Sequence, residues 1–129
     1  MDCVVDFRHE DREYAVHFDL TAFEDLEREG FRGVRKLFAQ IEDLEVAALK
    51  AAMRHGLAGY GRLCVARGEP RPEAVKSAGE LCMAFGLKES SDVLVAALSM
   101  AAVRTRPKGE PAADAGAGAA AEEPRPGAG

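Results

Sequence analysis

The segment that most constrains the fold is the stretch over residues 17–30, which reads HFDLTAFEDLEREG. It holds the end of an alternating strand, a helix start and a helix stop within one short run. Thr21 and Glu24 have the spacing of a capping box, in which each side chain satisfies an unpaired backbone N–H at the start of a helix. Gly30 suits the left-handed position after a helix, and the Phe that follows it then falls opposite Leu26, as in a Schellman motif. The segment therefore predicts a very short helix that is fixed at both ends.

The residues before this helix predict a β-hairpin. In residues 3–8 and again in residues 13–19, apolar side chains recur at every second position, as in half-buried strands. Residues 9–12 between them form a link short enough for antiparallel pairing, although it lacks the Asn-Gly or Asp-Gly pair typical of a two-residue turn. A lone hairpin is only marginally stable in water, so we expect its apolar face to pack against the rest of the chain. That face is expected to carry Cys3, Val5, Phe7, Tyr14, Val16 and Phe18, with Ala15 and His17 on the opposite, polar face.

Helical periodicity continues after the short helix. Apolar residues within 34–41 recur at i, i+3, i+4 and i+7, which predicts a second short amphipathic helix. Asp43 is then placed to cap a third helix over residues 44–55, and Gly56 is expected to end it. Residues 56–72 are rich in Gly and Pro, so we expect a connection there.

Two more helices are expected in the second half of the chain. A proline suits the first turn of a helix, which predicts a fourth helix over residues 72–85, ended by Gly86. Ser90 or Ser91 is expected to cap a fifth helix over residues 92–104.

The composition changes after Arg104. The remaining residues include no aromatic residue and no Leu, Ile or Val, but much Ala, Gly and Pro. Such a segment cannot bury enough apolar surface to offset the entropy lost on ordering, so residues 105–129 are expected to be disordered. Residues 1–104 are expected to form a single small domain of the α+β class, mostly α, with an N-terminal antiparallel β-hairpin followed by about five short helices.

Composition and charge exclude several classes of partner and compartment. Of the 129 residues, 47% are hydrophobic and 30% are charged, and the net charge is −5, whereas binding to nucleic acid or to an anionic membrane needs clustered Lys and Arg. No run of about 18 apolar residues is present, and the opening MDCVVDFRHEDRE is unlike a secretory signal, so we expect a cytoplasmic protein. The cysteines Cys3, Cys64 and Cys82 are odd in number and form no CxxC pair, so we expect reduced thiols.

The sequence contains no arrangement typical of catalysis. The three histidines fall in different expected elements, and no two of them have the spacing of metal ligands. His55 is interpreted as a residue that interacts with a helix C-terminus. Gly56, Gly59 and Gly61 superficially suggest a phosphate-binding loop, but such a loop follows a strand and opens a helix. We therefore expect a non-enzymatic protein with no cofactor and no metal.

Residues 80–98 follow the spacing of a helix-turn-helix, with Gly86 in the turn. A reading helix needs Arg, Lys, Asn or Gln at exposed positions to reach base edges, so the segment is interpreted as an ordinary helical corner. A small transcription regulator, or another helical interaction adaptor, is kept as the alternative, while a small enzyme would need a pocket of convergent polar groups. The exposed positions of the second helix are expected to be Asp92, Val95, Ala96, Ser99 and Met100.

The order of elements over residues 3–58 resembles the small tail assembly chaperones of long-tailed phages, most closely those of gene transfer agents and related prophages. The resemblance is carried by the Y-x-V-x-F-D-L stretch that ends the hairpin, by the Leu26-Glu27 pair and Gly30 of the short helix, and by ALKAAMRHGL at residues 48–57. The hairpin turn lacks the Gly that is common in that family.

This resemblance implies a non-enzymatic protein that binds the tape-measure protein and the tail-tube protein in the cytoplasm of the infected or producing bacterial cell. It would keep these partners soluble during tail morphogenesis and be absent from the finished particle; self-association is left open. The apolar residues on the first short helices exceed what a small hairpin can cover, so a partner helix could bind them, although we expect the majority to be core. The candidate protein-binding residues are Phe23, Leu26, Phe31, Val34, Leu37, Phe38 and Ile41.

Overall fold

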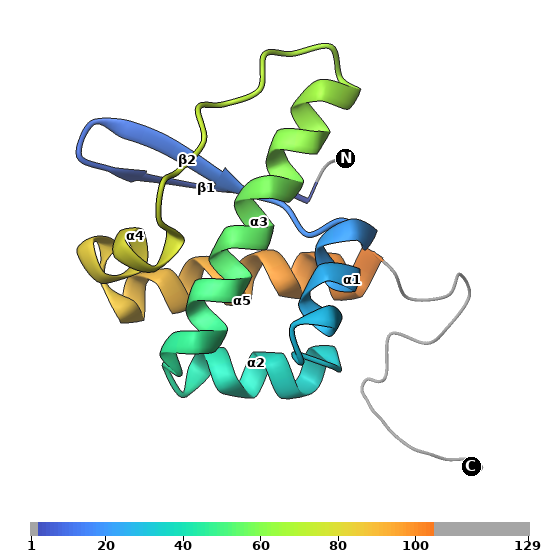
Figure 1. Ribbon diagram of the computed structural model, residues 1–129, viewed down its shortest axis with the longest axis vertical. Helices are drawn as coiled ribbons and strands as arrows, with labels where there is room; N and C mark the ends of the chain where they lie inside the picture. Colours follow the sequence, from blue (N-terminus) through green and yellow to red (C-terminus); the bar gives the residue numbers. More distant parts are fainter. Residues whose placement is uncertain (1–2, 105–129) are drawn as a thin grey trace.

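The computed structural model describes residues 3–104, in which an antiparallel hairpin is followed by five helices (Figure 1). The predicted fold class, α+β and mostly α with an N-terminal hairpin, is confirmed. The predicted disorder of residues 105–129 lies outside the described residues. The elements are β1 (Val5–His9), β2 (Arg12–Val16), α1 (Leu20–Arg28), α2 (Val34–Glu42), α3 (Val46–Ala66), α4 (Ala78–Phe85) and α5 (Leu87–Arg104).

The hairpin has a tighter turn than the sequence suggested. The last pair of the antiparallel ladder is His9 and Arg12, so only Glu10 and Asp11 lie between the strands. Both of these residues are left-handed, with φ of 49° and 64°. Two successive left-handed residues are typical of a type I′ turn, whose twist matches that of the strands. Gly or Asn usually occupies these positions, which is why the sequence did not indicate the turn type.

The strand β2 ends at Val16, before the end of the predicted strand over residues 13–19. The chain then leaves the sheet and passes across α3, where the backbone N–H of His17 donates to the carbonyl of Gly56 at 3.0 Å. The assignment of Ala15 and His17 to a polar face was wrong, because both are buried. Since Val16 is fully buried as well, both sides of this segment are covered by the rest of the fold.

The helix α1 begins at a different cap from the one predicted. The Asp19 carboxylate accepts a hydrogen bond at 2.8 Å from a backbone N–H of the first turn, whereas Thr21 lies inside the helix and is exposed. Asp and Thr are both good N-cap residues. Because the Asp19 carboxylate accepts this hydrogen bond, the helix begins before Thr21. The predicted end is confirmed: Gly30 has a φ of 98°, and the N–H of Phe31 donates to the carbonyl of Leu26 at 2.9 Å, as in a Schellman motif.

The helix α2 covers the predicted periodic residues, but Asp43 ends this helix instead of capping the next one. The N–H of Leu44 donates to the carbonyl of Ile41 at 3.0 Å, and the N–H of Glu45 donates to that of Gln40 at 3.0 Å. This is a second Schellman pattern, with Leu44 in the left-handed position at φ 60°. A left-handed leucine costs about 1 to 2 kcal/mol. Leu44 packs against the core, and that packing opposes the cost.

The helix α3 contradicts the predicted stop at Gly56 and the predicted connection over residues 56–72. It continues through all three glycines of its second half. A Cβ atom at Gly59 would lie 2.0 Å from the carbonyl oxygen of His17, and one at Gly56 would lie 3.1 Å from the Cβ of Val16. These two glycines therefore allow the chain after β2 to approach the helix closely, and they do not terminate it.

The connection between α3 and α4 covers residues 67–77, so α4 begins later than predicted. Ser77 caps it, since its hydroxyl accepts a hydrogen bond from a backbone N–H of the first turn at 3.1 Å. Gly86 ends α4 as predicted, but α5 begins directly after it, so Ser90 and Ser91 lie inside this helix and do not cap its N-terminus. Both are buried, and the Ser91 hydroxyl donates at 3.0 Å to a carbonyl at the end of α2.

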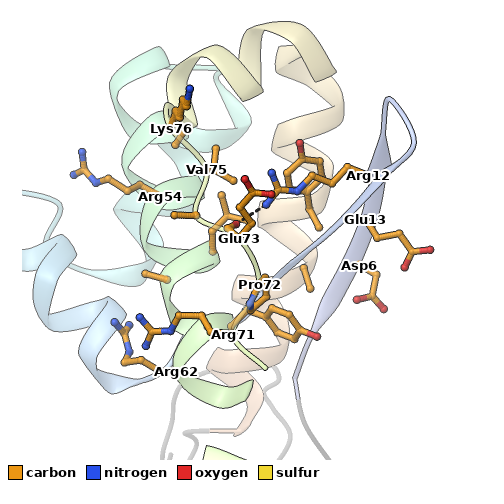
Figure 2. A pocket seen from close by; sticks show the side chains of 18 residues that line it. Asp6, Arg12, Glu13, Arg54, Arg62, Arg71, Pro72, Glu73, Val75 and Lys76 are labelled. Atoms are coloured by element: carbon orange, nitrogen blue, oxygen red, sulfur yellow. Dashed lines mark hydrogen bonds between the residues drawn. The ribbon is translucent and has the colours of Figure 1, made fainter. Parts of the chain in front are cut away.

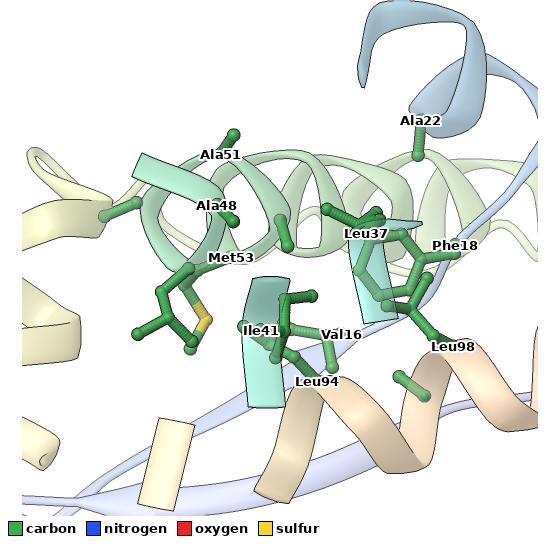
Figure 3. Close-up of a cluster of buried hydrophobic side chains, with 14 of the residues drawn as sticks. Val16, Phe18, Ala22, Leu37, Ile41, Ala48, Ala51, Met53, Leu94 and Leu98 are labelled. Atoms are coloured by element: carbon green, nitrogen blue, oxygen red, sulfur yellow. The ribbon is translucent and has the colours of Figure 1, made fainter. Parts of the chain in front are cut away.

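The hairpin and all five helices contribute side chains to one hydrophobic cluster (Figure 3). The long helix α3 contacts the hairpin and each of the other helices, and α5 packs against β1, α2, α3 and α4. The positions of α1 and α4 are thus set mainly by these two helices (Figure 1). The largest fully buried apolar side chains are Val16, Leu26, Ile41, Leu49, Met53, Leu94 and Leu98.

Candidate protein-binding surface

The structure divides the seven candidate residues into two groups. Leu26, Leu37 and Ile41 are 1%, 2% and 0% exposed and belong to the hydrophobic core. Their side chains hold α1 and α2 on the rest of the fold, so a partner cannot reach them in this structure. The remaining four are half-buried, and we call them the α1–α2 surface: Phe23, Phe31, Val34 and Phe38.

The members of the α1–α2 surface lie on two helices and the corner between them. Phe23 is on α1, where its ring lies 5.8 Å from that of Phe18. Phe31 follows the Schellman motif, and Val34 and Phe38 are one turn apart on α2. Half-buried aromatic residues of this kind are the type that protein interfaces favour.

Basic side chains are interspersed with this surface. Arg32, Arg35 and Lys36 are all exposed, and none of them forms an ion pair with a residue that the structure describes. An apolar centre with a charged, solvent-exposed rim is the usual anatomy of a protein-binding site.

One ion pair attaches the start of α1 to α3. Arg62 of α3 donates twice to the Asp19 carboxylate, from Nε at 2.8 Å and from Nη2 at 2.9 Å. The hydrogen bonds from Arg62 hold the pKa of Asp19 below its usual value, although burial opposes them. Asp19 therefore caps α1 and at the same time fixes it to α3.

A second charged cluster lies at the other end of α1. The interpretation of His55 as a helix C-terminal residue was wrong, because α3 continues past it. Its Nε2 instead lies 2.7 Å from the Glu29 carboxylate, and its Nδ1 lies 3.9 Å from that of Asp25. Arg54 also pairs with Glu29. Burial raises the pKa of Glu29, but the hydrogen bonds from His55 and Arg54 outweigh it, so that the pKa is lowered.

These charged groups are engaged in holding two helices together. Within residues 3–104, no three His, Cys, Asp or Glu side chains are placed to hold a metal ion together. The helices of that same region include none with the length and apolar character needed to cross a membrane.

A pocket of about 490 Å³ lies between β2, α3 and the connection over residues 67–77 (Figure 2). Its volume falls within the range of ligand sites. Arg12 joins the connection to the hairpin, since its guanidinium donates to the carbonyl of Glu73 at 2.5 Å and lies 4.8 Å from the centre of the Tyr14 ring. The basic side chains that line the pocket are Arg12, Arg54, Arg62, Arg71 and Lys76.

Sequence reasoning did not find this pocket. Its walls come from three separate segments, one of which, the second half of α3, was expected to be a connection. A helical spacing through Met53, Leu57, Tyr60 and Cys64 could have indicated that α3 continues, and hence that Arg54 and Arg62 lie on one face of it.

The helix-turn-helix alternative concerns α4, Gly86 and α5. The helix α5 packs against four other elements, and the structure gives its surface no Arg, Asn or Gln among residues 87–102. Lys88 is exposed there, but its ammonium pairs with the carboxylate of Asp92 at 2.8 Å.

The chain was also compared with known proteins. No protein-family model, no curated protein and no solved structure matches it.

Proposed function

We propose that this chain is a tail assembly chaperone of a long-tailed phage, a prophage or a gene transfer agent. In this role it binds the tape-measure protein and the tail-tube protein in the cytoplasm of the producing cell, keeps them soluble and leaves before the particle is complete. It performs no catalysis, and its action consists of covering apolar segments of its partners.

The observation that carries the proposal is the α1–α2 surface. Phe23, Phe31, Val34 and Phe38 remain half-buried although the core beneath them is complete. A helix of a partner that presents apolar residues at i, i+3, i+4 and i+7 would cover such a surface. The tape-measure protein is the expected source of such a helix, and the order of hairpin, capped short helix and amphipathic helix supports that assignment.

The direct experiment is co-expression with a candidate tape-measure protein, followed by measurement of the soluble fraction of that protein. We expect the soluble fraction to rise severalfold when the chain is present. A tape-measure protein that is equally soluble without the chain would contradict the proposal.

Substitutions on the α1–α2 surface test whether this surface is responsible for the solubilisation. Val34→Gln removes an apolar contact at a half-buried position outside the core cluster, and Phe38→Ser removes a ring. Met83→Ser on α4 is the control, because this residue is 63% exposed and lies outside the surface. We expect the first two variants to lose solubilisation and the control to keep it, with circular dichroism confirming that each is folded. If Val34→Gln behaves like the control while the wild-type chain solubilises its partner, the function stands and the surface is wrong.

A further inference from the structure

We propose that the pocket between β2, α3 and the 67–77 connection binds a short acidic peptide segment, whose carboxylates contact Arg62 and Arg71 while a neighbouring apolar side chain packs on Leu57 and Val75. This inference goes beyond the proposed function and does not rest on it, because the pocket shares no residue with the α1–α2 surface.

The side chain of Arg71 lies close to Gly61 of α3. A Cβ atom at Gly61 would lie 3.5 Å from the Nε of Arg71 and 3.7 Å from its Cγ. The arginine side chain thus lies along the helix where the helix carries no side chain of its own. Arg62 is the next residue of α3, and Figure 2 shows its guanidinium and that of Arg71 on the same side of the pocket.

These two guanidinium groups form one ion pair between them among the described residues, and Asp25 also interacts electrostatically with Arg62. Arg62 is paired with Asp19, whereas Arg71 is exposed and forms no ion pair with any residue in 3–104. Lys76, which lines the same pocket, is exposed and lacks an ion pair within that range as well. Arg71, which has no ion-pair partner in that range, favours a further anion, and an arginine fork fits a carboxylate with two hydrogen bonds.

The acidic residues that line the pocket are Asp6 and Glu13 on the hairpin and Glu73 on the connection, and the basic residue Arg12 also comes from the hairpin. Asp6 and Glu13 come from the hairpin, and Figure 2 shows them on the other side of the connection from Arg62 and Arg71. Glu13 is also engaged by Arg8 outside the pocket at 2.9 Å. Arg62 and Arg71 therefore give an acidic ligand a favourable position that is away from Asp6 and Glu13.

The remaining lining favours a peptide over a simple anion or a long polyanion. Leu57 and Val75 are half-buried pocket residues that offer apolar area beside the arginines. A volume of about 490 Å³ exceeds what one inorganic anion needs. A nucleic acid would extend beyond the pocket, where the net charge of −5 would repel its phosphates, whereas a short peptide with two carboxylates stays within the pocket.

The test is fluorescence anisotropy with the full chain and two labelled peptides, GLEELAG and its uncharged counterpart GLQQLAG. We expect the acidic peptide to bind about tenfold more tightly than the uncharged one, because an interaction with a charged hydrogen-bond partner is lost in the latter. Arg71→Glu is expected to weaken binding of GLEELAG about tenfold or more for the same reason. The control is Lys50→Glu, which makes the same charge change at an exposed residue of α3 outside both the pocket and the α1–α2 surface and is expected to bind like the wild type.

Three results would overturn the inference. One is equal binding of the two peptides, and another is equal loss in Arg71→Glu and Lys50→Glu, which would indicate a general effect of net charge. The third is displacement of GLEELAG by inorganic phosphate as effective as displacement by the unlabelled peptide, which would mean that the site recognises an anion and not a peptide. Solubilisation of a tape-measure protein is measured separately, so failure here leaves the proposed function unaffected.

Discussion

The substitution Gly59→Ala tests the close crossing of α3 by the chain that leaves β2. By helix propensity alone, alanine in place of glycine in a helix interior stabilises a protein by about 0.5 to 1 kcal/mol. At this position the added Cβ would lie 2.0 Å from the carbonyl oxygen of His17, far inside an ordinary contact distance of about 3.5 Å. The segment at His17 must therefore move by more than about 1 Å, which strains the bond from its N–H to the carbonyl of Gly56.

The gain in helix propensity and the cost of overpacking have opposite signs, and the cost of overpacking is the larger. Overpacking of a core costs about 1 to 3 kcal/mol, and a weakened hydrogen bond costs about 1 kcal/mol more. After the gain in propensity is subtracted, we expect Gly59→Ala to lower the free energy of unfolding by about 2 kcal/mol. For a domain of this size, that loss lowers the melting temperature by about 8 to 16 °C.

Gly61→Ala in the same helix is the matched control. The atoms nearest to its added Cβ belong to the Arg71 side chain at 3.5 Å or more, which is ordinary contact, so only the gain in propensity of about 0.5 to 1 kcal/mol remains. Urea unfolding followed by circular dichroism at 222 nm gives both values. If Gly59→Ala is as stable as Gly61→Ala, then the strand does not cross α3 as closely as described, and the explanation given for the glycines is refuted.

The other predictions concern charges and buried hydroxyl groups. Asp19→Ala is expected to lower the free energy of unfolding by about 2 kcal/mol, since it removes a helix cap and the partner of Arg62. Thr21→Ala is expected to change it by less than about 0.5 kcal/mol. Similar losses for the two variants in urea unfolding would contradict the assignment of the cap. Because the pKa values of Asp19 and Glu29 are lowered in the folded chain, their contribution is present above the carboxyl pKa values of the unfolded chain and is lost as the pH falls through the folded values. Melting temperatures measured from neutral to acidic pH should therefore fall, and Asp19→Asn, which keeps a capping side chain, should flatten that fall. Ser91→Ala removes a buried hydrogen bond to the end of α2 and should cost about 1 kcal/mol in the same unfolding assay; no change would mean that the bond contributes nothing.

The outcome for the glycines explains how far the sequence could predict the fold. Gly30 and Gly86 were correctly assigned as helix ends, and both have positive φ. Gly56 has the same local surroundings, a helical stripe before it and a large apolar residue directly after it, yet it lies within a helix. What differs is the segment at residues 16–17 that crosses the helix there, and this contact joins residues some forty positions apart. A rule based on neighbouring residues cannot distinguish these two uses of glycine.

The predictions of two helix caps were wrong for a related reason. Asp19 and Thr21 are both good N-cap residues, and each offers a consistent local structure. Asp19 prevails because Arg62, in a distant part of the chain, binds the same carboxylate. Asp43 likewise does not cap α3 as predicted, because Leu44 adopts the left-handed conformation and its side chain packs against the core. In each case a tertiary contact selected among local alternatives that were close in energy.

The seven candidate binding residues differ in burial for a reason that periodicity alone does not reveal. A helical stripe in the sequence contains both the residues that hold a helix on the core and those that remain beside it, and periodicity gives them the same weight. On α2, Leu37 and Ile41 point into the core, while Val34 and Phe38, on the flank of the same stripe, stay half-buried. A substitution at Leu37 or Ile41 would therefore lower stability and binding together and could not reveal a partner. Only the flank residues can separate the two effects, so any claim about what this surface binds has to be tested there.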